Sequence, residues 1–531
     1  MSARRLRICL VALIIGLTCF LLAVWVPRSP RRTADTAAPP VQDAAPSTPP
    51  HAPPPGRPFR PQPLAYTGAV PDAADLRSAV EGANVIICVL DAARADHFGA
   101  YGYPRDTTPN FDRLAGEGVL FEQHFCEAPE THPSTISLLT GEYPDTHGQL
   151  TNGPAQVSVA GRWPALTLEG AFADAGFSTY LVSSSKIVTP EFGIGRDFQE
   201  QYFVEDPRTR PHYSRQPEGR GTLDLITALD EQLDQVGREW KRDDAPFFTY
   251  IHVYPPHDPY VAPERFQSPF RGKQPPYYWR ARTPTGIGDA VKPGEPKPGD
   301  VWLDLYDANM RWADSFLGHL EETLRKSGLL EHTLLIVTAD HGEAMREHGY
   351  AFHINCPYDE TLHIPLLVRF PRARVPRGRV YALTQTIDLF PTFLDLFRIA
   401  GSHPGLQGKS LLPLLTGEVP KVNDFLVSRT TGDTCCYTVR DAHYALLLHA
   451  GAGGRALYDL DDDPWETIDL YRKERARASA LERAFASFAR GQRYPPTAFP
   501  DLTPAVRAPK PPLEELTSQQ QRVLHSLGYA K

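Results

Sequence analysis

The chain has 531 residues, enough for one large domain with appendages, and 41% of them are hydrophobic, which is typical of a folded protein with a sizeable core. Its 55 Lys and Arg residues against 63 Asp and Glu residues give a net charge of −8, so it lacks the basic surplus of a nucleic-acid-binding protein and no nucleic-acid partner is expected. The seven cysteines are scattered and none stands in a C-x-x-C pair, which argues against a disulfide framework and a cysteine-based zinc site.

The N-terminal segment, residues 1–27, contains an uncharged apolar run, "ICLVALIIGLTCFLLAVWV", which is just long enough to cross a bilayer. The run ends at Trp25 and Val26 without a small-residue cleavage site, which favours an uncleaved membrane anchor but leaves a cleaved secretory signal open. Arginines on both sides leave its orientation unset. Residues 28–80, rich in Pro and Ala, are predicted to form an extended spacer between this segment and a folded domain.

Short apolar runs alternate with helical stretches from residue 84 onwards. The predicted strands are "NVIICVL" (84–90), "STYLVSS" (178–184), "PFFTYIHV" (246–253) and "TLLIVTA" (333–339), and the predicted helices cover 111–117, 166–175 and 301–327. Uninterrupted apolar strands separated by helices predict an α/β fold, with a doubly wound, mostly parallel sheet flanked by helices. In such sheets ligands bind at the carboxyl ends of the strands.

Three of these strands end in polar residues. The residues concerned are Asp91 after the first strand, His252, His257 and Asp258 at the third, and Asp340 and His341 after the fourth. A single carboxylate after a strand is ordinarily a helix cap. Three such sets at one sheet edge combine carboxylates with imidazoles, which are the ligands that zinc and manganese bind in proteins. The sequence therefore predicts a metal site at this edge, with His252 and Asp258 as spare ligands.

The stretch "APETHPSTISLLTG", residues 128–141, predicts a helix that begins near His132, because Pro133 suits a first helical turn. Free N–H groups and the positive end of the helix dipole attract phosphate or sulfate at such a terminus. Thr131 stands just outside the predicted helix. From the local sequence alone, its hydroxyl either caps the helix or attacks an anionic ester.

The order of several motifs resembles the sulfatase family, within the alkaline phosphatase superfamily. The motifs are "HPSTISLLTGEYPDTHG", "PPHDPY", "TADHGEAMREHG", "YDETLHIPLLVRFP", "TIDLFPTFLDLF" and "LYDLDDDPWE", and the similarity runs from about residue 84 to 466. The resemblance implies a catalytic domain over residues 81–418 and a C-terminal subdomain over 419–490, with a small antiparallel sheet and a helix at 473–490. A tail over 491–531 would carry a short terminal helix.

The resemblance also implies roles for individual residues. Asp91, Asp340 and His341 match metal ligands of the family. His257 matches a histidine that assists the leaving group or the sulfate oxygens, and His353 stands where the family has a Lys or His facing the anion. Lys186, in "SSSK", loosely matches an anion-binding lysine.

Two departures from the family pattern bear on the chemistry. Sulfatases convert a Cys or Ser in the pattern C-x-P-x-R to formylglycine, whereas this chain has Thr131 and Thr135 at the Cys and Arg positions. Because threonine carries a methyl group on Cβ, it cannot become the aldehyde. Ala92 replaces the second of two adjacent aspartates, and losing that oxygen ligand favours zinc or manganese, with calcium also compatible. Thr131 is then expected to ligate the metal or to attack the ester directly.

Three functions follow as hypotheses. The first is a metal-dependent hydrolase of sulfate, phosphate or phosphonate esters, acting on an anionic glycan, lipid or small molecule. The second is a membrane-linked phospho-group transferase of the phosphoethanolamine type, motivated by the apolar segment. The third is a catalytically silent sulfatase-like binding protein, motivated by the missing Cys and Arg. The N-terminal segment predicts a membrane-anchored protein with an extracytoplasmic, periplasmic domain, or a secreted one if the segment is cleaved.

Overall fold

The computed structural model describes residues 64–152, 167–204, 225–240, 245–271, 298–373, 375, 377–401, 405–430, 436–450, 454–493, 496, 499 and 501–502. Three predictions therefore fall outside the described residues: the apolar segment at 8–26, most of the spacer, and the terminal helix in the 491–531 tail. Among the helices that are described, none is both long and apolar enough to span a bilayer.

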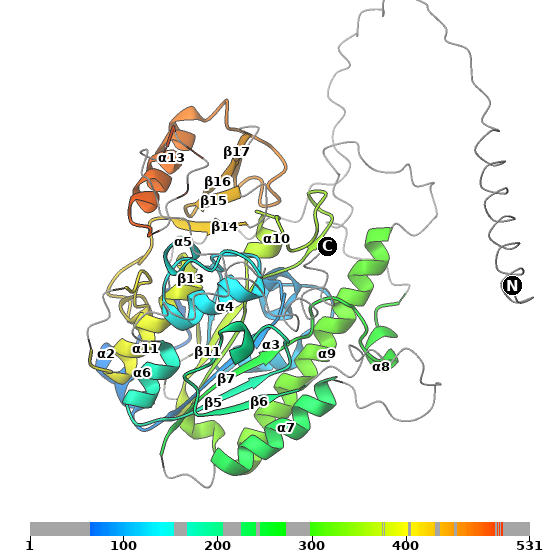
Figure 1. Ribbon diagram of the computed structural model, residues 1–531, viewed down its shortest axis with the longest axis vertical. Helices are drawn as coiled ribbons and strands as arrows, with labels where there is room; N and C mark the ends of the chain where they lie inside the picture. Colours follow the sequence, from blue (N-terminus) through cyan, green and yellow to red (C-terminus); the bar gives the residue numbers. More distant parts are fainter. Residues whose placement is uncertain are drawn as a thin grey trace, which may run out of the picture. The chain divides into compact units, whose positions relative to one another are not determined.

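A nine-stranded sheet forms the centre of the fold, in the order β1-β12-β3-β11-β8-β2-β7-β5-β6 (Figure 1). The five strands from β8 to β6 run parallel: β8 (Thr333–Ala339), β2 (Asn84–Leu90), β7 (Phe247–Val253), β5 (Ser178–Ser183) and β6 (Glu200–Phe203). Next to β8, β11 (Leu366–Arg369) runs antiparallel to it and to β3 (Val119–Phe121), and β12 (Gly378–Val380) and β1 (Leu64–Tyr66) complete the edge. The mostly parallel sheet is as predicted.

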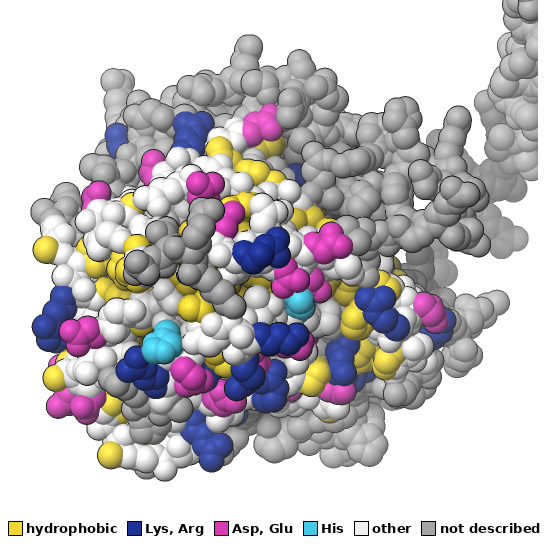
Figure 2. Space-filling view, turned by 90° about the horizontal axis from the view of Figure 1, so that it is seen from below, with side chains coloured by type: hydrophobic (Ala, Val, Ile, Leu, Met, Phe, Trp, Pro, Cys, Tyr) yellow, Lys and Arg dark blue, Asp and Glu magenta, His cyan; other side chains and the backbone are white. Residues whose placement is uncertain are grey.

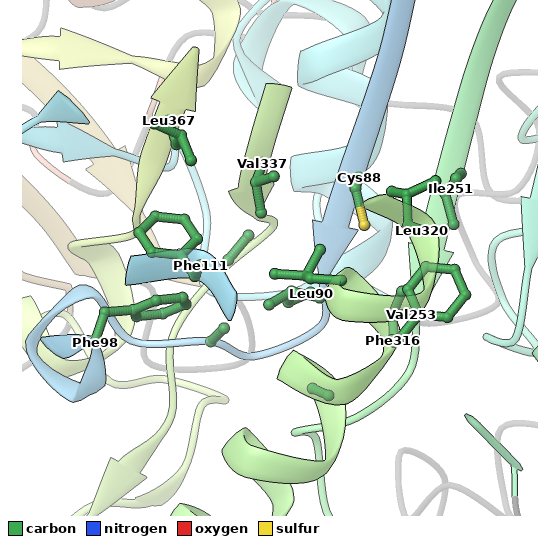
Figure 3. Packing of buried hydrophobic residues seen from close by; sticks show 14 of the residues in the cluster. Cys88, Leu90, Phe98, Phe111, Ile251, Val253, Phe316, Leu320, Val337 and Leu367 are labelled. Atoms are coloured by element: carbon green, nitrogen blue, oxygen red, sulfur yellow. The ribbon is translucent and has the colours of Figure 1, made fainter. Parts of the chain in front are cut away.

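Helices cover both faces of this sheet. Alternate residues of β2 enter two separate cores: Cys88 and Leu90 join one, and Val85 and Ile87 join the other. The first core includes side chains of α3 (Pro109–Ala115), α7 (Leu225–Trp240) and α9 (Pro298–Ser327), and the second includes side chains of α2 (Ala73–Val80), α4 (Thr131–Thr140), α6 (Leu168–Asp174) and α11 (Leu389–Phe397). Figure 3 shows Phe316 and Leu320 of α9 beside Cys88 and Leu90. Burial of β2 on both faces explains its unbroken apolar sequence.

A second, four-stranded antiparallel sheet forms the C-terminal part, as the sequence predicted. Its strands follow chain order: β14 (Leu426–Arg429), β15 (Cys436–Arg440), β16 (Tyr444–His449) and β17 (Arg455–Asp459). The helix α13 (Arg475–Arg490) packs on it, since Leu481 and Phe485 share a core with Val439 and Leu446 (Figure 1).

The predicted spacer is too long at its C-terminal end. Residues 64–66 form β1, which pairs with β12, and α2 begins before residue 80 with a capping box between Asp72 and Asp75. Tyr66 also donates a hydrogen bond from its hydroxyl to the Leu415 carbonyl, at 3.0 Å. The folded region therefore starts about twenty residues before the first strand that the sequence indicated. The sequence did not reveal this strand, because it is only three residues long and its pairing partner, β12, lies more than 300 residues away.

Short elements complete the fold. They are β4 (His124–Phe125), α5 (Pro144–His147), α8 (Glu264–Gln267), β9 (Ala344–Met345), β10 (Ala351–Phe352), α10 (Asp359–Leu362), β13 (Thr384–Gln385) and α12 (Leu412–Leu415). On the face shown in Figure 2, Lys and Arg side chains are interspersed with Asp and Glu side chains among the described residues.

Candidate metal centre

Three buried side chains converge where β2 and β8 end. Asp91 follows β2, and Asp340 and His341 follow β8, its direct neighbour in the sheet. One ligand atom from each of the three lies within 4.8 Å of the others, and each residue is no more than 2% exposed. The structure thus brings together the three metal ligands that the sequence predicted, at the sheet edge where parallel strands place a site.

The hydrogen bonds of this cluster suit a bound cation. His341 donates from Nδ1 to the Gly342 carbonyl at 2.8 Å, which leaves the lone pair of Nε2 directed at the carboxylates. Asp340 accepts through Oδ1 from the Ala92 and His341 backbone amides at 3.1 and 2.9 Å, while its buried Oδ2 accepts no hydrogen bond from the described residues. A buried acceptor without a donor is costly, and a cation beside Oδ2 and Nε2 would satisfy both.

The pKa values of the clustered side chains also favour a bound cation. Burial raises the pKa of the Asp91 carboxyl well above its usual range, and repulsion from the nearby Asp340 carboxylate adds to that rise. Burial also lowers the pKa of His341 to about 4, so its imidazole is neutral at pH 7. Two carboxylates and a neutral imidazole at one buried point form the donor set of a divalent cation.

Thr131 faces this cluster. The helix α4 begins at Thr131, one residue earlier than predicted, and the residue at its N-cap position is Glu130. The Glu130 carboxylate accepts a hydrogen bond from the Asn152 backbone at 2.7 Å. The Thr131 hydroxyl lies 3.2 Å from His341 Nε2 and 3.5 Å from Asp91 Oδ1. The helix-cap interpretation of Thr131 is therefore wrong: its hydroxyl points at the cluster and not at its own helix.

A tight turn at Ala92 follows β2 and Asp91, next to the cluster. Ala92 has a φ of 62°, a left-handed conformation that non-glycine residues seldom adopt. Its carbonyl accepts a hydrogen bond from the Tyr306 hydroxyl at 2.7 Å, and that hydroxyl accepts one from the Arg94 amide at 3.0 Å. Tyr306 of α9 thus holds the turn in place through both hydrogen bonds. In this turn the Ala92 amide donates to Asp340 Oδ1. Conformational strain of this kind gathers at functional sites.

Two further histidines lie beside His341. The His353 ring centroid lies 4.3 Å from that of His341 and 4.9 Å from that of His257. Glu343 orients His353 through a 3.0 Å contact between Oε1 and Nδ1. Burial alone would lower the pKa of His257, but the carboxylates of Asp91, Asp258 and Glu343 raise it to about 9. The predicted His257 and His353 thus lie against His341, one of the three clustered residues.

His252 and Asp258 are placed differently from the spare ligands that the sequence suggested. His252 Nε2 lies 3.1 Å from Asp91 Oδ2, and its Nδ1 lies 3.3 Å from the Tyr250 hydroxyl. Burial lowers the pKa of His252 to about 4, so the neutral ring donates to Asp91 and accepts from Tyr250. His252 therefore holds Asp91 through Oδ2, the oxygen that does not face Thr131 and His341. Asp258 is 34% exposed, and its Oδ1 lies 3.1 Å from His257 Nδ1. It therefore pairs with His257 and is not part of the three-residue cluster.

Lys186 stands at the same edge of the sheet, three residues after β5, and its side chain is half-buried. The backbone before it is fixed to β7, because the Ser184 amide donates to the His252 carbonyl at 3.0 Å. Its role as an anion-binding lysine remains a prediction.

Sequence reasoning missed Glu343 and Tyr250. Glu343 stands inside "TADHGE", two residues after His341, and is fully buried. Tyr250 stands two residues before His252 on β7, so both side chains point to the same face of the sheet. A carboxylate two residues beyond a candidate ligand, and a hydroxyl at strand spacing from a candidate histidine, are the signals that could have identified them.

Comparison with known proteins decides the family. The family model for sulfatases matches residues 83–399, well over half of the chain, and that for the C-terminal part of N-sulphoglucosamine sulphohydrolase matches residues 346–485. The chain belongs to the sulfatase family. This membership, within the alkaline phosphatase superfamily of ester hydrolases, is what the motif order implied.

Curated relatives and solved structures agree with the family. Iduronate 2-sulfatase of Homo sapiens is 26% identical over 388 residues, covering 64% of this chain and 68% of its own. The multifunctional alkaline phosphatase superfamily protein PehA of Trinickia caryophylli is 24% identical over 479 residues, covering 73% and 91%. A structure of the phosphonate monoester hydrolase of Agrobacterium radiobacter superposes with a TM-score of 0.60 at 21% identity, covering 76% of this chain and 95% of the other. A structure in complex with D-glucosamine-2-N,6-O-disulfate gives 0.63 at 18%, covering 77% and 97%.

Proposed function

We propose that this sulfatase-family protein is a metal-dependent hydrolase of sulfate, phosphate or phosphonate esters in which the Thr131 hydroxyl takes the place of formylglycine. The observation that carries the proposal is the position of Thr131 Oγ1, 3.2 Å from His341 Nε2 and 3.5 Å from Asp91 Oδ1. No cap or packing role of a helical threonine requires its hydroxyl to lie between two metal-ligand side chains. An activated nucleophile does require such a place.

Each residue then has a defined task. A divalent cation held by Asp91, Asp340 and His341, with zinc or manganese favoured over calcium, would lower the pKa of the hydroxyl and offset the charge of the ester. Thr131 Oγ1 releases its proton to solvent and attacks the sulfur or phosphorus atom, and the bond from that atom to the ester oxygen breaks. His257 gives its proton to the leaving oxygen. His353 and Lys186 bind the non-bridging oxygens, and water then releases the sulfuryl or phosphoryl group from Thr131.

The relatives support this range of substrates without selecting one. Their names include iduronate 2-sulfatase, N-acetylglucosamine-6-O-sulfatase and the multifunctional superfamily protein, and the structural neighbours include a phosphonate monoester hydrolase. We propose an anionic ester as the substrate class. The apolar segment at residues 8–26 supports a location at a membrane, with the catalytic domain in the periplasm, or secretion if the segment is cleaved.

Two alternatives each rest on one observation. The apolar segment also suits a transferase that passes a phospho-group to a lipid or glycan acceptor. The buried Thr135, which stands where the sulfatase motif has arginine, suits a binding protein without turnover. The products distinguish the three functions. A hydrolase releases free sulfate or phosphate, a transferase forms a modified acceptor, and a binding protein forms no product.

The decisive assay is a panel of sulfate, phosphate and phosphonate esters, measured before metal removal, after chelation, and after zinc, manganese or calcium is added back. We expect turnover with release of the free anion, loss of turnover on chelation, and recovery with one of the three ions. We also expect Asp340→Ala to reduce metal content below one equivalent. Full metal content in that variant would show that the site is elsewhere, and turnover untouched by chelation would overturn the metal dependence.

A further inference from the structure

The first turn of α4, which carries Thr131, does not supply its own cap. Glu130, at the N-cap position, makes no side-chain hydrogen bond to the helix, and Pro133, the third helical residue, has no N–H group. The His132 amide is therefore a donor of the first turn that needs an acceptor from outside the helix. The Thr131 hydroxyl faces the metal cluster and is directed away from its own helix. A buried amide left without an acceptor would destabilise this turn.

Asn152 supplies the missing acceptor from another segment of the chain. Its Oδ1 accepts a hydrogen bond from the His132 amide at 2.7 Å, although the two residues are 20 positions apart. The side chain of a favoured N-cap residue makes this same bond with the amide of the second helical residue. Asn152 is 1% exposed, and its Nδ2 has no acceptor among the described residues, so the side-chain oxygen is the atom that makes the contact. Asn152 thus caps α4 without preceding it in the sequence.

A second hydrogen bond joins Asn152 to the residue on the other side of Thr131. The Asn152 amide donates to Glu130 Oε2 at 2.7 Å, and both residues are buried. Glu130 and His132 flank Thr131 in the sequence, so one residue holds both neighbours of the candidate nucleophile. A nucleophile needs to be held in a fixed position by the groups around it. These two bonds provide that support at the start of α4.

Two other polar side chains of the first turn are bonded away from the ester position. Burial lowers the pKa of His132 to about 4, and its neutral ring donates from Nε2 to the Phe192 carbonyl at 2.7 Å. The Ser134 hydroxyl donates to the Asp340 carbonyl at 2.6 Å, which ties the turn to the backbone of a metal-ligand residue. The orientation of the turn relative to the cluster is therefore fixed, and Thr131 is the residue that directs its hydroxyl at the ligand side chains.

We propose that Asn152 is a positioning residue for the Thr131 hydroxyl, which it orients by capping α4 from outside the helix. Threonine is itself a favoured N-cap residue, and in that role its hydroxyl bonds to a helix amide. A hydroxyl engaged in this way is turned from the metal cluster and is not available to attack an ester. Because Asn152 supplies the capping acceptor, the Thr131 hydroxyl faces the cluster instead. The inference rests on the proposed function, since it names a residue that orients the nucleophile of that site.

The kinetic test compares two variants of Asn152 at equal metal content, on the ester of the panel that the parent chain hydrolyses fastest. Asn152→Leu keeps the size of the side chain but removes the acceptor, and it should lower kcat by about 10- to 100-fold with KM within about threefold, because a displaced nucleophile slows the chemical step. Asn152→Asp keeps an oxygen at the position of Oδ1, and its kcat should stay within about threefold of the parent. Burial raises the pKa of Glu130 to about 8, so at pH 7 the introduced carboxylate meets no like charge from that residue.

Two comparisons separate positioning from a general loss of structure. In a Thr131→Ala background Asn152→Leu should not lower the residual rate further, because no hydroxyl is left to orient. The matched control is Asn423→Leu, which removes an equally buried asparagine that donates to Asp388 at 2.8 Å, and kcat should equal that of the parent. A further fall of the residual rate in the double variant would overturn the proposal, as would a fall in kcat that Asn152→Leu and Asn152→Asp share.

Hydrogen exchange of the peptide that covers residues 130–134 tests the cap without any substrate. Asn152→Leu should raise the exchange rate of the His132 amide, and Asn152→Asp should leave it close to that of the parent. Unchanged exchange in Asn152→Leu would overturn the proposal whatever the activity. If Asn152→Leu does not fold, Asn152→Ala replaces it with the same expectations. Absence of ester hydrolysis by the parent chain would instead contradict the proposed function, and exchange would still decide whether Asn152 caps α4.

Discussion

The two carboxylate oxygens of Asp91 have different neighbours. Oδ1 faces Thr131 and His341, at 3.5 and 3.6 Å, while Oδ2 faces His252 at 3.1 Å. A ligand carboxylate that accepts a hydrogen bond on one oxygen keeps its other oxygen directed at the ion. Motif spacing identified the residue types but not this arrangement, because a sequence does not tell which oxygen of a carboxylate points where.

The contact from His252 predicts an effect on metal affinity. His252→Leu should weaken zinc or manganese binding by about 10- to 100-fold, because Asp91 loses the donor that orients it. His252→Gln keeps an N–H near the position of Nε2 and should bind the metal more tightly than the leucine variant. Isothermal titration of the chelated protein measures both, with circular dichroism to confirm that each variant is folded. Equal affinities in the two variants would show that the donor has no such role.

The beginning of α4 shows what the sequence predicts about an element and what it leaves open. Pro133 in the first turn and the apolar stretch behind it predicted the helix correctly. Its first residue was misplaced because the N-cap position is held by Glu130, which is not a favoured capping residue and binds Asn152 instead. That bond depends on the fold around residue 152, so the orientation of Thr131 could not be derived locally.

The β9–β10 hairpin carries a prediction about pH. Burial would lower the pKa of His348, but the hydrogen bond and charge of Glu360 raise it to about 9 from an ordinary value near 6.5. Protonated His348 therefore stabilises the fold fully below pH 6.5, and this contribution is lost as the pH rises through about 9. His348→Gln should lower the free energy of unfolding by up to about 3 kcal/mol at pH 6, with a difference that shrinks towards pH 10. Denaturant unfolding at several pH values measures it, and a difference that does not change with pH would contradict the assignment.

At the scale of the whole molecule, the sequence predicted β2, β5, β7 and β8 of the main sheet, and it missed β6 and the strands on the other side of β8. The strands β2, β7 and β8 are unbroken apolar runs because both their faces are buried, and such runs stand out in a sequence. β1, β3 and β12 have three residues each, and their pairings join distant parts of the chain, so no local pattern reveals them.

The C-terminal sheet is joined to the main domain by polar contacts. Arg429 pairs with Asp145 of α5 at 2.7 Å, and Arg440 pairs with Asp359 of α10. The Ser428 hydroxyl donates to the Cys126 carbonyl at 2.6 Å. These contacts reach the segments that flank α4 and the His353 hairpin, so the C-terminal part stabilises the surroundings of the candidate site as well as its own core.

The central claim is that the Thr131 hydroxyl is the nucleophile, and replacement of that one residue at matched metal content tests it most directly. Thr131→Ser retains a hydroxyl and should keep a substantial part of the ester hydrolysis rate, whereas Thr131→Ala should lose at least about 10³-fold in kcat because no nucleophile remains. Both variants keep Asp91, Asp340 and His341, so the measured metal content should equal that of the parent chain. Hydrolysis by Thr131→Ala at the rate of the parent chain would contradict the claim.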